Sequence, residues 1–119
     1  MLDIKLKNCR IVDGTGAPWF RGEVGITGGK IALVRSSIPG DAFRVIDLEN
    51  RALCPGFIDM HTHSDLRLCS CPGEDAKLMQ GITTALLGQD GLSVAPLSPA
   101  AQPMMKTRLL GLNGSLDTW

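Results

Sequence analysis

The stretch Pro55–His63, with the sequence PGFIDMHTH, carries the clearest structural signal in the chain. Pro55-Gly56 is typical of a turn, and Phe57 to Met60 predicts a short strand that ends at His61. Because side chains at positions i and i+2 of an extended segment point to the same face, His61 and His63 can present two imidazoles to one metal ion. An isolated His-x-His pair is more often a surface feature, but the strand-end position favours a metal site, and nitrogen ligands suit Zn²⁺.

A catalytic zinc usually has three protein ligands and a water molecule, so the two histidines need a further partner. Asp59, Asp65, Asp90 and the cysteines are the candidates. By strand alternation Asp59 lies on the same side as His61, which suits a ligand, a residue that supports a ligand, or a carboxylate that bonds the backbone.

Two other candidates lie farther along the chain. Asp90 stands in Gly88-Gln89-Asp90-Gly91, directly after a second predicted strand, where a metal ligand and a turn aspartate are equally compatible with the pattern. Cys69 and Cys71 form a Cys-x-Cys pair on a predicted loop, and without a second pair at zinc-finger spacing they are expected to be ordinary thiols.

The residues before Pro55 have the pattern of short β-strands. Apolar and polar residues alternate from Leu2 to Lys7, and Gly28-Gly29 predicts a tight hairpin turn between two further strands. Phe43–Leu48 and Ala52–Cys54 are additional strand candidates. We therefore expect a small antiparallel sheet or β-sandwich over residues 1–54.

The residues after Gly56 have a different pattern, in which strands and helices alternate. Glu74–Gln80 predicts a short helix, and Ile82–Leu87 predicts a strand that is buried on both faces. Ser98-Pro99 is typical of a helix start, and that helix is expected to run to about Leu110, with Gly111 and Gly114 ending it and its Met and Leu pairs facing the core. Residues 55–119 thus predict the βα repeat of a parallel sheet or barrel.

Composition excludes several function classes. Lys plus Arg and Asp plus Glu both number 12, so the net charge is zero and nothing attracts nucleic acid or an anionic membrane. No apolar run is long enough to span a membrane, and the N-terminus lacks the apolar region of a secretory signal. A cytoplasmic location follows as an expectation, with the four cysteines as free thiols.

Several motifs together resemble the opening of the amidohydrolase superfamily. They are Gly22–Ile26, Gly29–Ile31, Pro55–His63, Gln80–Thr84 and Gly88–Pro96. The later motifs are similar to those of N-acyl-D-amino-acid deacylases (D-aminoacylases), with hydantoinases and dihydroorotases as more distant relatives. The resemblance covers nearly the whole chain.

The resemblance implies a fold and a site. The fold is a small β-sandwich, mainly residues 1–54, followed by the start of a (β/α)8 TIM-like barrel over residues 55–119. His61 and His63 would be the metal ligands of the first barrel strand. The deacylases carry a metal-binding cysteine after the second strand, in a Gly-Asn-Cys-Gly context, and Asp90 occupies the matching position here. The predicted site therefore comprises His61, His63 and Asp90 as ligands of one or two zinc ions, supported by Asp59.

The resemblance also implies hydrolysis of an amide C–N bond in a small-molecule substrate by a metal-activated water. A (β/α)8 barrel needs about 250 residues, so the barrel is expected to be incomplete in this chain. We therefore expect an N-terminal portion of a longer enzyme, with the catalytic carboxylate and further ligands beyond residue 119, and little or no hydrolase activity for the chain alone. The alternatives are a cyclic-amide hydrolase of the hydantoinase or dihydroorotase type, and a non-catalytic module that mediates contacts with a partner or within a homo-oligomer.

Overall fold

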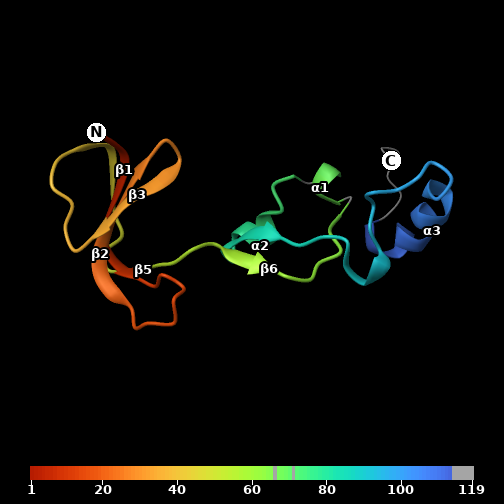
Figure 1. Cartoon of the computed structure of the whole chain (residues 1–119), viewed down its shortest axis with the longest axis horizontal. Coiled ribbons are helices and arrows are strands. Elements are labelled where there is room, and N and C mark those ends of the chain that lie inside the picture. The colour runs from red at the N-terminus through yellow and green to blue at the C-terminus, as the bar shows by residue number, and fades with distance from the viewer. Residues whose placement is uncertain (66, 71, 114–119) are drawn as a thin grey trace. The chain divides into compact units, whose positions relative to one another are not determined.

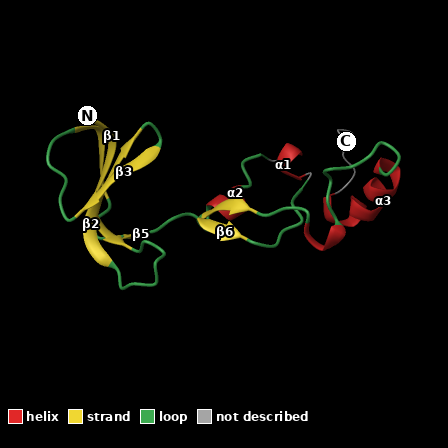
Figure 2. Ribbon diagram, viewed as in Figure 1, coloured by secondary structure: helices red, strands yellow, loops and turns green. Residues whose placement is uncertain are grey.

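A computed structural model describes residues 1–65, 67–70 and 72–113 of the chain. The chain divides into two compact units, Met1–Pro55 and Gly56–Trp119 (Figure 1). Strands make up most of the first unit, whereas the second combines two strands with short helices (Figure 2). Among the described residues, no helix combines the length and apolar character needed to span a membrane.

The first unit is built on one five-stranded sheet. Its strands are β1 (Leu2–Ile11), β2 (Phe20–Thr27), β3 (Lys30–Arg35), β4 (Ala42–Asp47) and β5 (Ala52–Leu53). The order is β3-β2-β1-β4, and β5 also pairs with β1. The hairpin at Gly28-Gly29 is confirmed: both glycines have positive φ angles, which glycine adopts at no steric cost.

The direction of two strands corrects the expectation of an antiparallel sheet. β4 and β5 both run parallel to β1, while β2 is antiparallel to it, so the sheet is mixed. The apolar alternation that predicted these strands is the same for both directions. The described residues of this unit contain this one sheet, so the second layer of a sandwich stays a prediction.

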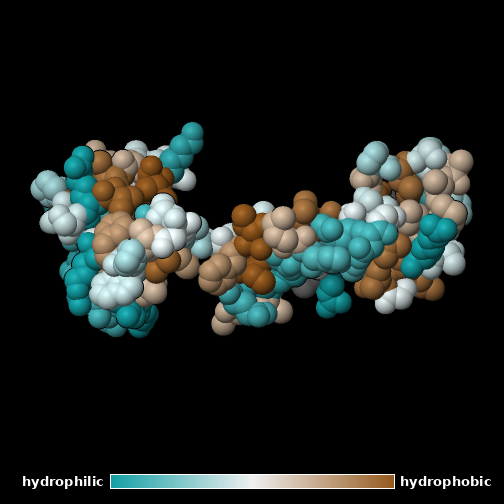
Figure 3. Space-filling model, turned by 60° about the horizontal axis from the view of Figure 1, so that its bottom comes forward, coloured by the Kyte–Doolittle hydropathy of each residue, from teal (hydrophilic) through white to brown (hydrophobic). Residues whose placement is uncertain are grey.

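Burial in the first unit concentrates on one small cluster. Cys9, Ile11 and Val24 are each at most 6% exposed, and they pack with four partly buried side chains, Leu6, Ile26, Leu48 and Leu53. Several large apolar residues of the chain instead remain on the surface, as the hydropathy colouring shows (Figure 3).

The second unit begins with a strand–helix–strand arrangement. β6 (Phe57–Asp59) and β7 (Ile82–Ala85) pair in parallel, as predicted, and the helices α1 (Arg67–Ser70) and α2 (Asp75–Leu78) lie between them in sequence. A short 3₁₀ turn, η1 (Gln89–Gly91), follows β7. Because β6 and β7 are parallel, their carboxyl ends meet at the same edge of the sheet.

The last helix, α3 (Gln102–Asn113), starts later than the sequence predicts. The backbone N–H of Ala101 donates to the Ser98 carbonyl at 3.0 Å, so Ser98-Pro99 forms a turn that precedes the helix. Gly111 lies inside α3, which corrects its expected role as a terminator, and Gly114 lies outside the described residues. One member of each predicted pair is buried, Met105 and Leu109, whereas Met104 and Leu110 are each 51% exposed. Because Met105 and Leu109 are four residues apart, they share one face of the helix, and their immediate neighbours cannot.

Candidate metal centre

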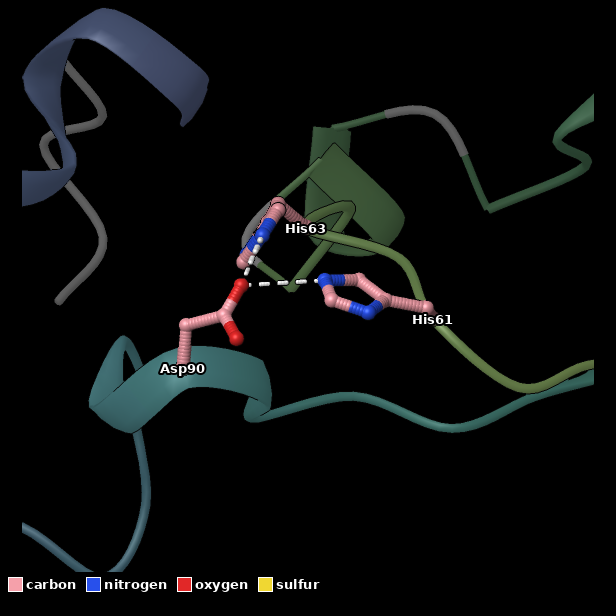
Figure 4. A group of neighbouring side chains, drawn as sticks. All are labelled: His61, His63 and Asp90. Atoms are coloured by element: carbon pink, nitrogen blue, oxygen red, sulfur yellow. Dashed lines mark hydrogen bonds and ion pairs between the residues drawn. The ribbon is translucent and has the colours of Figure 1, made fainter.

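The carboxyl ends of β6 and β7 bring together three side chains that are far apart in sequence. His61 and His63 lie in the loop that follows β6, and Asp90 lies in η1, after β7. Their potential ligand atoms all lie within 4.8 Å of one another (Figure 4). These are the three residues that the sequence analysis proposed as ligands.

One carboxylate oxygen is the centre of the cluster. Asp90 Oδ2 lies 3.0 Å from His61 Nε2 and 3.3 Å from His63 Nε2, and Figure 4 shows both rings directed at it. The ring centroids are 5.3 Å apart, and the rings are inclined by 76°. The two imidazoles therefore present the same ring nitrogen to the same point.

The donor set and its spacing fit a zinc ion. Atoms that lie about 2.0–2.1 Å from a tetrahedral zinc are separated from each other by about 3.3 Å, close to both Nε2–Oδ2 separations. Imidazole nitrogen and carboxylate oxygen are both zinc ligands in proteins. The side chains of His61 and Asp90 are 58% and 60% exposed, so the cluster is open to solvent.

The conformation of Asp90 depends on its place in the turn. Asp90 has a φ of 57°, in the left-handed region that aspartate tolerates better than most residues, and the glycines on either side of the turn, Gly88 and Gly91, also have positive φ angles. This arrangement of turn residues directs the Asp90 carboxylate at the histidines. In the sequence, the pattern Gly-Gln-Asp-Gly directly after a predicted strand indicates Asp90 as a candidate ligand.

Asp59 lies outside the three-residue cluster. One of its oxygens forms an ion pair with Lys77 Nζ at 3.1 Å. The other accepts a hydrogen bond from the His61 backbone N–H at 3.2 Å. These contacts, that of Lys77 first, hold the pKa of Asp59 below its ordinary value, so this carboxylate stays ionised at neutral pH. Asp59 thus fixes the backbone at His61, which is one of the roles considered for it from sequence.

Lys77 also contacts the loop around His61, and no motif in the sequence indicated this residue. Its ammonium group also donates to Thr62 Oγ1 at 2.7 Å and lies 3.5 Å from Glu74. Lys77 therefore contacts residues on both sides of His61. A lysine on a short helix is usually solvated, so no local pattern predicts this role.

Two further contacts connect the ligand-bearing loops to each other. The Gly88 N–H donates to Asp65 Oδ1 at 3.1 Å, and Gln89 Nε2 donates to the Met60 carbonyl at 3.2 Å. Asp65 is 6% exposed and does not belong to the three-residue cluster, and its described role is this contact with Gly88. Cys54 is exposed in the first unit, Cys71 lies outside the described residues, and the side chain of Cys69 is not described either.

Two parallel strands with a candidate metal site at their carboxyl ends are typical of metal-dependent hydrolases with a barrel fold. Comparison with known proteins agrees with this class. Residues 44–113 match a family model described as "Amidohydrolase family". The match covers more than half of the chain, which therefore belongs to the amidohydrolase family.

Among the curated relatives are deacylases of N-acyl-D-amino acids. The chain is 37% identical to N-acyl-D-glutamate deacylase of Alcaligenes xylosoxydans xylosoxydans, over 92% of this chain and 22% of that protein. It is 40% identical to N-acyl-D-aspartate deacylase of the same organism, over 81% of this chain and 19% of the relative. The chain thus spans about a fifth of the length of the curated relatives it matches.

Solved structures give the same result. A D-aminoacylase studied for its binuclear metal center superposes with a TM-score of 0.78 at 39% identity, over 84% of this chain and 21% of the relative. N-acyl-D-glutamate deacylase from Bordetella bronchiseptica, in complex with zinc and a phosphonate inhibitor, superposes with a TM-score of 0.73 at 37% identity, over 87% of this chain and 23% of that chain. An L-hydantoinase from Arthrobacter aurescens is more distant, with a TM-score of 0.62 at 28% identity, over 73% of this chain and 20% of that one.

Proposed function

We propose that this chain supplies the first two metal-binding loops of a hydrolase that cleaves the amide C–N bond of N-acyl-D-amino acids. The observation that carries the proposal is the convergence of His61, His63 and Asp90 within 4.8 Å at the carboxyl ends of two parallel strands. In this proposal β6 and β7 are the first strands of a (β/α)8 barrel, whose catalytic sites form at that end of the strands. The sheet of the first unit is then part of a small sandwich.

His61, His63 and Asp90 would hold a zinc ion. Bound zinc supplies an activated water and polarises the amide carbonyl. The surrounding residues of the chain hold the ligands in place: Asp59 and Lys77 fix the loop after β6, and the contact of Gln89 with the Met60 carbonyl fixes the distance between the loops. Such preorganisation reduces the cost of ordering the ligands when the metal binds.

The substrate class is inferred from the relatives. Several of them are deacylases whose substrates, as their names state, are N-acyl derivatives of D-glutamate and D-aspartate. A dihydroorotase from Elusimicrobium minutum is also 32% identical over 87% of this chain, so cyclic amides form the alternative substrate class. Both classes are small molecules with an amide carbonyl that a zinc site can polarise.

Metal binding is the first test. We expect isothermal titration of the chain with Zn²⁺ to show binding that weakens by at least about 100-fold in the His61→Ala, His63→Ala double variant, because two of three ligands are lost. Asp41→Asn, an exposed carboxylate in the first unit, serves as the matched control and should bind as the wild type does. Equal zinc affinity of the double variant and the wild type would overturn the site.

Whether this chain can supply the metal-binding loops of a deacylase is tested in a chimera. Residues 1–113 of this chain replace the matching segment of the Alcaligenes D-aminoacylase, to which 85% of this chain is 35% identical. We expect the chimera to hydrolyse N-acetyl-D-amino acids and the double histidine variant of the chimera to lose that activity. A chimera that folds, binds zinc and hydrolyses no N-acetyl-D-amino acid would contradict the deacylase proposal and favour the cyclic-amide class. The 119-residue chain alone is expected to show little or no activity.

A further inference from the structure

Two buried polar atoms in the described part of the chain have no hydrogen-bond partner, and both lie next to the candidate metal centre. They are Nδ1 of His63 and Oδ2 of Asp65. Burial of a polar atom without a partner costs free energy, so unpartnered atoms of this kind are rare in folded proteins. Here the two residues are only two positions apart in sequence. A protonated His63 Nδ1 can donate a hydrogen bond, and Asp65 Oδ2 can accept one.

The chemistry of a histidine ligand explains the unpartnered nitrogen. Nε2 of His63 faces Asp90 Oδ2 at 3.3 Å and is the atom that would bind the metal. A ring nitrogen that binds a metal carries no proton, so the single proton of the neutral imidazole then resides on Nδ1. That N–H is buried and needs an acceptor. Histidine ligands in proteins almost always donate this second N–H to a carboxylate, a carbonyl or a water.

Asp65 is the buried carboxylate that lies two residues from His63. It is 6% exposed, and its Oδ1 already accepts the Gly88 N–H at 3.1 Å, two residues before Asp90. Its second oxygen remains available. Asp65 thus belongs to the loop that carries His61 and His63, contacts the loop that carries Asp90 through Gly88, and has a second oxygen without a partner.

We propose that Asp65 is a positioning residue for the metal centre: its Oδ2 accepts the Nδ1–H of His63 when Nε2 binds the metal, while its Oδ1 retains the Gly88 N–H. This role rests on the proposed zinc site and adds to it the residue that selects the binding tautomer of His63. Asp65 itself contacts neither metal nor substrate.

The variant Asp65→Asn separates the two contacts. The amide oxygen still accepts the Gly88 N–H, whereas the amide NH₂ in place of Oδ2 offers a donor to Nδ1 and favours the tautomer that cannot bind a metal. We expect zinc affinity to fall about 10- to 100-fold, the usual range for loss of a partner of a metal ligand. Asp65→Leu removes both contacts and should weaken zinc binding further and lower the melting temperature. Asp75→Asn, an exposed carboxylate on α2, is the matched control.

A double-mutant cycle with His63→Ala distinguishes positioning from general stabilisation. Because Asp65 acts through His63, Asp65→Asn should leave the zinc affinity of the His63→Ala variant unchanged within about 2-fold. In the zinc-loaded wild type, nitrogen NMR should show a His63 Nδ1–H proton that is protected from exchange with water, and Asp65→Asn should abolish that protection.

Each other outcome overturns the inference. Wild-type zinc affinity in Asp65→Asn would show that the carboxylate does not act on the ligand. An equal loss of affinity with and without His63 would show that Asp65 acts elsewhere. If the wild type binds no zinc, the proposed function fails together with this inference; if zinc binds through His61 and His63 and Asp65→Asn has no effect, only this inference fails.

Discussion

Lys77 contacts residues on both sides of His61, in the loop that carries two of the candidate metal ligands. Its ammonium group lies 3.1 Å from the Asp59 carboxylate and donates to Thr62 at 2.7 Å. Asp59 in turn accepts the His61 N–H. The positive charge also keeps Asp59 paired, so that this carboxylate would not compete with Asp90 for a bound ion.

We predict that Lys77→Met weakens zinc binding about 10-fold, at the lower end of the effects of removing the partners of a ligand. Lys77→Arg keeps the charge and should recover most of the affinity. Isothermal titration measures both, with Lys106→Met on α3 as the control. Zinc affinity in Lys77→Met that equals that of Lys106→Met would contradict the prediction.

At this scale the sequence predicted residues that share a local pattern. His61 and His63 follow from strand alternation, and Asp90 from its position between turn residues after a second strand. The partners of these residues could not be predicted in the same way. The contact of Asp65 with Gly88 spans 23 residues and that of Lys77 with Thr62 spans 15, and such contacts arise only from the packing of separate elements.

Among the secondary-structure elements, the pairing of β6 with β7 depends on one glycine. A Cβ atom at Gly56, which directly precedes β6, would overlap the Thr83 side chain of β7. The backbone at Gly56 is otherwise ordinary, so the absence of a side chain is what allows the strands to approach.

Gly56→Ala is therefore expected to destabilise the second unit by about 1–3 kcal/mol, the usual cost of overpacking. Gly111→Ala is the matched control: a Cβ there meets no atom within 4 Å, and alanine in α3 should stabilise the helix by up to about 1 kcal/mol. Urea denaturation measures both changes. A Gly56→Ala variant as stable as the wild type would show that the strands can separate without cost.

In the first unit, Asp47 connects the end of β4 to β1. One oxygen of its carboxylate accepts a hydrogen bond from the Glu49 N–H, and both oxygens accept one from Asn8 Nδ2. The carboxylate also forms an ion pair with Lys7 at 3.2 Å. The Glu49 N–H, followed by Asn8, holds the pKa of Asp47 below its ordinary value. The unfolded chain therefore binds a proton at Asp47 more readily than the folded one does.

The contribution of the Asp47 carboxylate to the free energy of unfolding is therefore complete above the pKa of about 3.9 that it has in the unfolded chain. This contribution is lost as the pH falls through the lower pKa of the folded state. We predict that Asp47→Asn lowers the melting temperature at neutral pH and that the difference from the wild type narrows as the pH falls below about 3.9 and the Asp47 carboxylate becomes protonated. Thermal unfolding followed by circular dichroism checks this. A difference that stays constant with pH would mean that charge is not the cause.

Elements with a local signature were predictable, and so was strand pairing where a tight turn or a βα repeat dictates it, whereas the direction of β4 was not. Gly28-Gly29 predicted the hairpin of β2 and β3 because the turn needs positive φ angles at both positions. The parallel direction of β4 was missed, since the alternation of Phe43–Leu48 has no direction. The start of α3 was misplaced because Ser98-Pro99 forms a turn with the same residues that commonly begin a helix.

For the whole molecule, the division into Met1–Pro55 and Gly56–Trp119 places all three candidate ligands in the second unit. A ligand stabilises only the structure whose folded form it binds. Zinc at about 100 times its dissociation constant should therefore add about 2.7 kcal/mol to the second unit, which slows amide exchange there about 100-fold.

Hydrogen exchange with mass spectrometry tests this prediction directly. Peptides that cover β6 and β7 should gain protection on addition of zinc, while peptides that cover β1 to β3 should not. Equal gains in both units would show that they unfold together. The barrel, the sandwich and a homo-oligomer remain predictions, because the described residues form one five-stranded sheet and one two-stranded sheet.

The three candidate ligand atoms are two ring nitrogens and one carboxylate oxygen. Peroxide oxidises cysteine thiolates in steps to sulfenic, sulfinic and sulfonic acids. Imidazole and carboxylate groups do not undergo this oxidation. The resemblance matches Asp90 to a metal-binding cysteine of the deacylases, so a metal held by these three atoms would depend on no sulfur from that loop. An enzyme with this centre would retain its metal under oxidative stress that modifies the exposed Cys54 of the same chain.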